Sequence, residues 1–299
     1  MPESADFSVT TSGAINRVHL SALKLASRTG HIRRAAKALA RVRRNPGSAL
    51  VGFPDGGILE IDLRSSYWAR LAVGWDYEPE VRVVVDSALA FRPDLALLDC
   101  GSNIGYWGAR YARRCLVVAV EPVPTIYTSL QRTAQGNGFI ALHRAVWSRS
   151  DEAVEITWNP GGETAASAVY THAGARARVS TITIDELAET AHGRPLVVKL
   201  DVEGAEAQAV DGAERTGREA LWIYEDHGMD REHAATARFL ASGFQVLDIT
   251  STGRATQISS LDQLSGIKTN RKLGYNFAAF HAAGPWAGFG RTLVDARQS

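Results

Sequence analysis

The chain has 299 residues, of which 45% are hydrophobic and 22% are charged, a balance typical of a globular protein. A formal net charge of +1 offers no bulk attraction to nucleic acid, so we expect no nucleic-acid partner. Two cysteines, Cys100 and Cys115, are too few for a disulfide framework or a cysteine-based zinc site. The sequence has neither an apolar stretch of about 18 residues nor a signal-peptide core, so we expect a cytoplasmic protein with no membrane partner.

Residues 1–50 are predicted to form a basic helical arm. No acid occurs between Asp6 and Asp55, and apolar residues recur at helical spacing, with Gly30 between two helices. The basic residues of this stretch are Arg17, Lys24, Arg28, Arg33, Arg34, Lys37, Arg41, Arg43 and Arg44. We favour an arm that packs on the core or on a second subunit, which would make the protein a homodimer. A lid over an acidic or phosphorylated substrate and a membrane-surface or nucleic-acid helix are the alternatives.

Residues 51–90 are predicted to form a hairpin and a helix that precede the core. Apolar runs at 51–53 and 58–63 flank a glycine-containing turn, as in a hairpin, and Pro79 opens a helix that extends to about Ala90. Aromatic residues gather between the two: Tyr67, Trp68, Trp75 and Tyr77. Because clustered aromatics often belong to the core, we treat Trp68, Trp75 and Tyr77 as candidates for the substrate pocket and no more.

The segment Asp99-Cys100-Gly101-Ser102-Asn103-Ile104-Gly105 follows an apolar strand over 95–99 and precedes a helix over 105–114. A strand, a glycine turn and a helix in this order hold a nucleoside cofactor in α/β proteins. A dinucleotide site has glycine where this chain has Asn103, because the backbone approaches a pyrophosphate there. Asp99 would repel a pyrophosphate but could pair with an ammonium group. S-adenosylmethionine (SAM), with an ammonium, a sulfonium and a ribose but no phosphate, therefore fits better than NAD.

The next strand, predicted over 116–121, ends in a second cofactor signal. Glu121, in the pair Glu121-Pro122, lies 121 − 101 = 20 residues beyond Gly101. This is about the spacing at which an acid binds the ribose hydroxyls of a nucleoside. NAD enzymes share the spacing, so this half of the pattern does not distinguish the two cofactors.

The alternation of strands and helices continues through a predicted helix over 125–136 and a predicted strand over 140–144. Residues 153–180 then interrupt it. Strands over 154–158 and 176–180 are predicted to form a β-ribbon around a loop rich in glycine and small residues. We expect this insertion to form part of the mouth of the substrate site.

Acids follow the buried strand 196–200, at the edge of the sheet where open α/β proteins bind ligands. Four motifs resemble, by their order and spacing, the FkbM family of SAM-dependent methyltransferases. They are Asp99-x-Gly101-x-Asn103-x-Gly105, Glu121-Pro122, Thr181-Ile-Thr-Ile-Asp185-Glu-Leu187 and Lys199-Leu-Asp201-Val-Glu203-Gly204-Ala-Glu206. The resemblance covers residues 50–280 of the chain.

The resemblance implies an α/β fold of the Rossmann-like class I methyltransferase type over residues 91–299. Its mostly parallel sheet would have seven strands in the order 3-2-1-4-5-7-6, with the last strand antiparallel. Later strands are predicted over 220–224, 245–250 and 275–281, with a helix over 230–242. The residues expected at the cofactor are Asp99, Gly101, Ser102, Asn103, Gly105, Glu121, Pro122, Ala145, Val146, Trp147 and Asp201. In SAM enzymes the loop 145–147 reaches the adenine, and a buried Trp147 that only anchors this loop is the alternative.

The base for methyl transfer stays open among three residues. Transfer from a sulfonium is an in-line displacement, so the protein aligns donor and acceptor and removes a proton from the nucleophile. His227, Asp201 and Glu203 follow strand ends near the expected methyl group, and His227 can titrate near neutral pH. A reaction by proximity alone, with no protein base, is the alternative.

A metal-assisted reaction is a further alternative, which we do not favour. Asp201, Glu225 and Asp226 follow neighbouring strands, and their carboxylates suit Mg²⁺. Glu206 is expected instead to cap the start of the next helix, where a carboxylate is favourable.

The predicted function is therefore O-methylation of a small molecule in specialised-metabolite biosynthesis of the antibiotic type, with SAM as cofactor and the substrate class implied only by the resemblance. N- or C-methylation of a peptide-like or aromatic scaffold would use the same cofactor frame. Two alternatives come from other classes: an NAD-dependent oxidoreductase, which Asn103 and Asp99 disfavour, and a non-catalytic interaction protein that has kept the fold.

Overall fold

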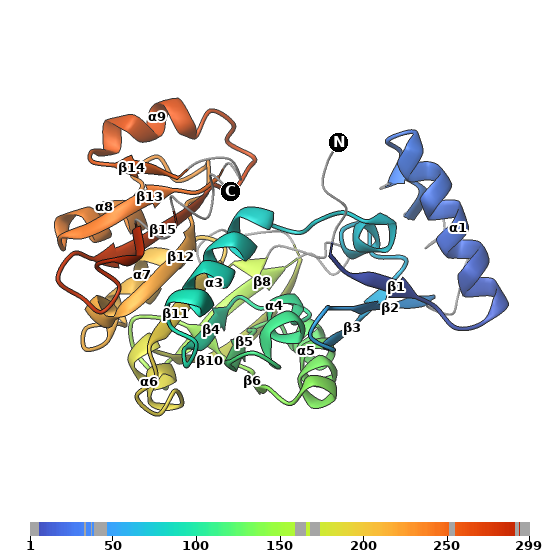
Figure 1. Cartoon of the computed structure of the whole chain (residues 1–299), viewed down its shortest axis with the longest axis horizontal. Coiled ribbons are helices and arrows are strands. Elements are labelled where there is room, and N and C mark those ends of the chain that lie inside the picture. Colours follow the sequence, from blue (N-terminus) through green and yellow to red (C-terminus); the bar gives the residue numbers. More distant parts are fainter. Residues whose placement is uncertain are drawn as a thin grey trace.

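The computed structural model describes residues 6–32, 34–36, 38, 47–158, 166–167, 174–250, 255–290 and 293. Its central sheet has eight strands in the order β14-β13-β15-β12-β11-β4-β5-β6 (Figure 1). The strands are β4 (Ala96–Cys100), β5 (Leu116–Val120), β6 (Ile140–Leu142), β11 (Leu196–Leu200), β12 (Ala220–Glu225), β13 (Phe244–Asp248), β14 (Thr256–Ile258) and β15 (Asn276–His281). The five neighbouring strands β12, β11, β4, β5 and β6 are parallel to one another. In contrast, β15 is antiparallel to both β12 and β13.

This sheet has one strand more than the sequence predicts. β14 pairs antiparallel with β13 at the edge of the sheet. Its three residues are too few to show a strand periodicity, which is why sequence patterning misses them. The predicted count of seven strands is therefore corrected to eight. The observed order β6-β5-β4-β11-β12-β15-β13 is extended by β14 beyond β13, and the antiparallel β15 is present as expected.

Helices cover both faces of the sheet because the strands are apolar on both sides. Successive residues of β4 point to opposite faces, so Leu97 packs in one core with α3, α4 and α5, and Leu98 packs in a second core with α6, α7 and α8. The helices are α3 (Pro79–Phe91), α4 (Tyr106–Tyr111), α5 (Pro124–Asn137), α6 (Ile184–Glu189), α7 (Glu206–Asp211), α8 (Ala234–Ala241) and α9 (Leu264–Ile267), with the 3-10 helices η1 (Trp68–Val73), η2 (Gly217–Glu219) and η3 (Leu261–Gln263). Within the described residues, none of the helices is long and apolar enough to cross a membrane.

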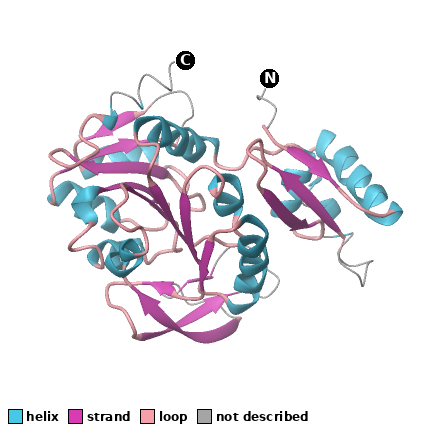
Figure 2. Ribbon diagram, turned by 60° about the horizontal axis from the view of Figure 1, so that its bottom comes forward, coloured by secondary structure: helices cyan, strands magenta, loops and turns pink. Residues whose placement is uncertain are grey.

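The N-terminal part is a small sheet with a helix rather than the purely helical arm predicted for residues 1–50. β1 (Ser8–Thr10), β2 (Ser48–Gly52) and β3 (Ile58–Asp62) pair antiparallel, so the predicted hairpin is confirmed and gains a third strand. α1 (Ala14–Arg28) is helical as predicted and lies on the outer side of this small sheet (Figure 2). Much of the predicted second helix falls at residues 33, 37 and 39–46, outside the described residues.

An ion pair fastens the N-terminal strand to the rest of the protein. Asp6, just before β1, accepts from the guanidinium of Arg110 on α4, with an Nη1 to Oδ1 distance of 3.0 Å. The Arg110 side chain is buried, so this contact belongs to the packing between the two parts. A homodimer through the N-terminal part stays a prediction.

The insertion after β7 (Ala145–Val146) contains the predicted β-ribbon. β8 (Ala153–Trp158) and β10 (Ala175–Ile182) pair antiparallel, and β9 (Ala166–Ser167) pairs with β8. β10 also runs parallel to β7, which places the ribbon beside the loop expected at the adenine. The rest of the predicted small-residue loop lies outside the described residues.

Candidate active site

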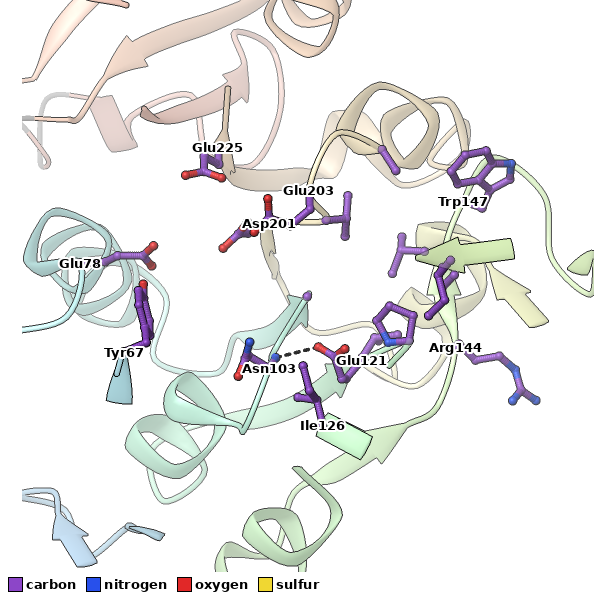
Figure 3. Close-up of a pocket in the computed structure, with 18 of the residues that line it drawn as sticks. Tyr67, Glu78, Asn103, Glu121, Ile126, Arg144, Trp147, Asp201, Glu203 and Glu225 are labelled. Atoms are coloured by element: carbon purple, nitrogen blue, oxygen red, sulfur yellow. Dashed lines mark hydrogen bonds between the residues drawn. The ribbon is translucent and has the colours of Figure 1, made fainter. Parts of the chain in front are cut away.

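A cavity lies at the carboxyl ends of β4, β5, β11 and β12 (Figure 3). The predicted site residues among its lining are Trp68, Tyr77, Gly101, Asn103, Glu121, Pro122, Ala145, Val146, Trp147, Asp201 and Glu203. The lining also contains Tyr67, Glu78, Val120, Ile126, Arg144, Ile156, Val202, Ala205 and Glu225. The structure thus brings most of the predicted residues together around one space.

Gly101 brings the ends of β4 and β11 into direct contact. Its φ of +83° is left-handed, and a Cβ at this position would lie 1.7 Å from the carbonyl oxygen of Asp201, so only glycine fits without moving a strand. The amides of Gly101 and Ser102 and the Ser102 hydroxyl all donate to the carbonyl of Val120. Ser102 therefore ties the turn to β5, and Gly105 is the N-cap of α4; both lie outside the cavity lining.

Glu121 is oriented by the backbone of two neighbouring segments. The amides of Asn103 and Val123 donate to its two carboxylate oxygens over 3.0 and 2.8 Å. Burial raises the pKa of Glu121 to about 7, and these hydrogen bonds oppose the rise. The Asn103 amide, which would face a pyrophosphate in a dinucleotide site, is thus already bonded to a carboxylate. A ribose, which presents hydroxyl donors, fits this carboxylate better than a phosphate does.

Asp99 does not stand at the mouth of the turn, where the sequence places it. Side chains alternate along a strand, so Asp99 shares a face of the sheet with Leu97 and lies in register with Lys199. It is fully buried, and neither of its oxygens has a hydrogen-bond partner within the described residues. Burial raises the pKa of Asp99 to about 6, against the attraction of Lys199. Asp99 lies outside the cavity lining, and the ammonium group beside it in the sheet is that of Lys199. The predicted contact between Asp99 and the ammonium group of SAM is therefore not formed by the cavity residues.

Part of the cavity lining is apolar. It consists of Ala145, Val146, Trp147, Ile126 from α5 and Ile156 from the β-ribbon. An aromatic base would be held well by such a lining. Sequence analysis does not identify Ile126 or Ile156, because an apolar residue that lines a cavity has the same pattern as one in the core.

Four carboxylates, those of Glu78, Asp201, Glu203 and Glu225, line another side of the cavity (Figure 3). They belong to the N-cap of α3 and to the ends of β11 and β12. The buried Lys199 donates to Asp201 over 3.1 Å. Burial and repulsion by Asp201 raise the pKa of Glu78 to about 7 and that of Glu203 to about 8, and they raise the pKa of Glu225 well above its usual value. This side of the cavity can therefore exchange protons near neutral pH.

The aromatic cluster faces the cavity only in part. Trp68 and Tyr77 line it, whereas Trp75 lies outside the lining and packs under Arg70, with the guanidinium carbon 3.4 Å from the ring centroid. Tyr67 also lines the cavity, next to Glu78 (Figure 3). Sequence cannot rank these rings, because the path of the chain through η1 decides which of them reach the cavity.

His227 lies beside the cavity rather than in its lining. With Glu225 and Asp226 it lines a smaller neighbouring cavity. Its Nδ1 accepts the amide of Met229 over 3.2 Å, and burial lowers its pKa. Of the three candidate bases, Asp201 and Glu203 are the ones that line the main cavity.

The three carboxylates of the magnesium alternative are divided between two environments. Asp226 is buried, forms an ion pair with Lys268, and accepts the Thr236 hydroxyl over 2.6 Å. In the part of the chain that the structure describes, no group of three or more metal-ligating side chains could hold a metal ion. Glu206 stands in the first turn of α7, as expected. Its carboxylate accepts the amides of Val202 and Gly204 over 3.0 Å each, so it holds the preceding loop, and the N-cap of α7 is Ala205 instead.

Solved structures resemble this protein only distantly. A putative transferase from Pyrococcus horikoshii has 11% identity and a TM-score of 0.39, over 83% of this chain and 83% of that chain. Precorrin-6y C5,15-methyltransferase from Geobacter metallireducens GS-15 has 10% identity and a TM-score of 0.38, over 68% of this chain and 88% of that chain. The ribosomal protein L11 methylase from Lactobacillus delbrueckii subsp. bulgaricus has 10% identity and a TM-score of 0.36, over 69% and 80%. No curated protein sequence matches the chain.

The family comparison covers the part of the chain that builds the cavity. Residues 99–246 match the family described as Methyltransferase FkbM domain, from the Asp99 turn through Glu121 to the acids that follow β11 and β12. SAM, the cofactor of such enzymes, fits the residues present: a fixed carboxylate at Glu121 for the ribose, and apolar side chains such as Val146 and Ile156 for the adenine. Residues 99–246 therefore form an FkbM methyltransferase domain, and the chain is a SAM-dependent methyltransferase.

Proposed function

We propose that the enzyme methylates a hydroxyl oxygen of a small molecule in specialised-metabolite biosynthesis. The observation that carries this proposal is Glu203, a carboxylate in the cavity lining whose pKa is raised to about 8 by burial and by Asp201. A base whose pKa lies near the working pH removes a hydroxyl proton efficiently. A concave lining that combines apolar side chains with a few polar groups supports a small molecule as the acceptor.

The residues of the cavity have separate roles in this reaction. Bound SAM supplies an electrophilic methyl group on a positively charged sulfur. Glu203 takes the hydroxyl proton as the acceptor oxygen bonds to the methyl carbon and the carbon–sulfur bond breaks, which leaves S-adenosylhomocysteine (SAH). Asp201, paired with Lys199, repels the charged form of Glu203 and so raises the proton affinity of Glu203. Glu203 has a φ of +53°, a strained backbone of the kind that gathers at functional sites.

The test uses SAM with a trideuterated methyl group and a pool of small molecules that carry hydroxyl groups, amines or activated carbons. Mass spectrometry identifies the labelled product, and NMR locates the label. We expect the label on oxygen, and we expect Glu203→Gln to lower turnover by about 100-fold, at the lower end of the range for a general base. Glu186→Gln, the same change at an exposed position of α6, should leave turnover unchanged. A label on nitrogen or carbon would replace O-methylation by one of the two alternatives.

We also propose that the reaction needs no Mg²⁺. Asp226, one of the three carboxylates that a magnesium site would require, is already paired with Lys268. Treatment with EDTA should therefore leave turnover unchanged. A loss of turnover that added Mg²⁺ restores would contradict this.

A further inference from the structure

We propose that the methyl acceptor also carries a positively charged amino group, and that Glu78 and Glu225 bind this group. The inference rests on the proposed function and adds the class of the acceptor, an amino alcohol. The hydroxyl group would be methylated, while the ammonium group would anchor the molecule in the cavity.

The cavity has far more acidic than basic groups. Its lining contains five acids, Glu78, Glu121, Asp201, Glu203 and Glu225, and within the described lining Arg144 is the one basic residue. Arg144 is exposed, donates to the carbonyl of His143, and points away from the acids (Figure 3). Bound SAM has a single net positive charge, since its carboxylate offsets one of its two cationic groups. Acidic groups therefore remain in excess in the cavity once the cofactor is bound, and a second bound cation would favour their charged forms.

Apart from Glu203, which is the proposed base, two of the five acids are left to bind the acceptor. Glu121 is taken by two backbone amides, and Asp201 by Lys199. The Oε2 atom of Glu78 is shielded from solvent and has no hydrogen-bond partner within the described residues. The strongest charged neighbours of Glu225 are all carboxylates, among them Asp201 and Glu78. Lys199 attracts Glu78 but already forms an ion pair with Asp201, so neither Glu78 nor Glu225 has a counter-charge of its own.

These carboxylates converge on one space although they come from different elements. Glu78 is the N-cap of α3, Asp201 follows β11, and Glu225 ends β12. Figure 3 shows all three carboxylates directed toward the same part of the cavity. Gly274 leaves room for the Glu225 carboxylate, because a Cβ at this position would lie 1.1 Å from its Oε1 atom. A cation in this space would lie close to several negative charges in a poorly solvated site.

Aromatic rings at the same place favour an organic cation over a metal ion. Tyr67, Trp68 and Tyr77 line the cavity with the acids, and Tyr67 lies next to Glu78 (Figure 3). Aromatic rings attract alkylammonium groups, and combinations of rings with carboxylates bind such groups in other proteins. A hard metal ion prefers several oxygen ligands around one point, which the described residues do not provide.

The probe is a pair of molecules with the same shape and different charge. Choline carries a trimethylammonium group, and 3,3-dimethylbutan-1-ol is its neutral carbon isostere. Each is titrated by calorimetry into the full-length enzyme loaded with SAH. We expect choline to bind more tightly than the alcohol by about tenfold or more. Equal binding of the two molecules, or binding of neither, would overturn the inference.

Matched variants assign the preference to the proposed anchor. Glu225→Gln and Glu78→Gln keep the size of the side chain and remove its charge, so each should bring the affinity for choline close to that of the alcohol. Glu186→Gln should retain the full preference. The SAH affinity of each variant, expected to match that of the original enzyme, shows that the site is folded. A preference that persists in both cavity variants would overturn the inference.

Two further measurements distinguish a failure of this inference from a failure of the proposed function, and binding at the anchor from binding at the methyl-donor position. Failure of the original enzyme to bind SAH would overturn the proposed function, and the inference with it. Because the methyl sulfonium is itself a cation, the titration is repeated with a SAM analogue that has a protonated amine at that position. Retained choline binding supports a separate anchor, whereas complete loss would place choline at the donor position and overturn the inference.

Discussion

Glu121 is held by the amides of Asn103 and Val123 before any ligand binds, so its carboxylate is preorganised for ribose hydroxyls. Glu121→Ala removes this acceptor and leaves both amides without their partner. We expect the affinity for SAH to fall by about 10- to 150-fold, which corresponds to roughly 1.5–3 kcal/mol for charge-assisted hydrogen bonds. Calorimetric titration measures the change, with Glu186→Ala as the control. An unchanged affinity would show that the ribose binds elsewhere.

Glu203 can act as a base only in its deprotonated form. Its pKa of about 8 means that this form becomes populated as the pH rises, so kcat/KM should increase with pH and level off above about pH 8. The rise should disappear in Glu203→Gln. Because Glu203 and Asp201 interact, the profile reports the pair rather than one residue. A rise with its midpoint near the usual value of a glutamate, about 4.3, would contradict the role of Glu203.

At the scale of elements, the contact between β4 and β11 depends on a missing side chain. In Gly101→Ala the added methyl group would meet the carbonyl of Asp201 at 1.7 Å, so the two strand ends must separate. We expect a lower melting temperature and an affinity for SAH reduced by at least about tenfold, as for other strained left-handed sites. Gly136→Ala is the control, because a Cβ on this α5 residue has no heavy atom within 4 Å. That change should raise stability by up to about 1 kcal/mol, and equal behaviour of the two variants would contradict the account.

Sequence predicts the central strands well and the edge strands poorly, for a physical reason. β4, β5 and β11 are buried on both faces, so each one is a run of apolar residues bounded by turn signals. β1 and β14 have three residues each and are held by backbone pairing at an edge, which leaves no pattern in the side chains. The helical arm predicted over residues 1–50 therefore misses β1, and the predicted sheet misses β14.

The residues of the candidate site also fall into those that the sequence predicts and those that it does not. Gly101, Glu121 and Asp201 stand at strand ends, where the cofactor turn and the parallel sheet fix their positions, and sequence identifies them. Glu78 reaches the cavity only because α3 begins there with a left-handed residue, φ +42°. His227 turns into a neighbouring cavity. The positions of Glu78 and His227 depend on the paths of the loops between elements. These paths leave no periodic pattern in the sequence, so the sequence does not predict them.

For the whole molecule, the buried acids predict how stability depends on pH. Burial raises the pKa values of Glu78, Asp99, Glu121, Glu203 and Glu206 to between about 6 and about 8. The folded state therefore binds more protons than the unfolded state between about pH 4 and pH 8, so the free energy of unfolding falls as the pH rises through this range. The melting temperature of the ligand-free protein should be lower at about pH 8.5 than at about pH 6. A higher value at the more alkaline pH would contradict the burial of these acids.

The central claim is that the cavity at the ends of β4, β5, β11 and β12 binds SAM and not a dinucleotide. The most direct test is calorimetric titration of the purified protein with SAH and, separately, with NADH. We predict binding of SAH with a dissociation constant on the order of 1–10 µM and no binding of NADH. Binding of NADH, or the absence of SAH binding by a folded protein, would contradict the assignment of the cofactor.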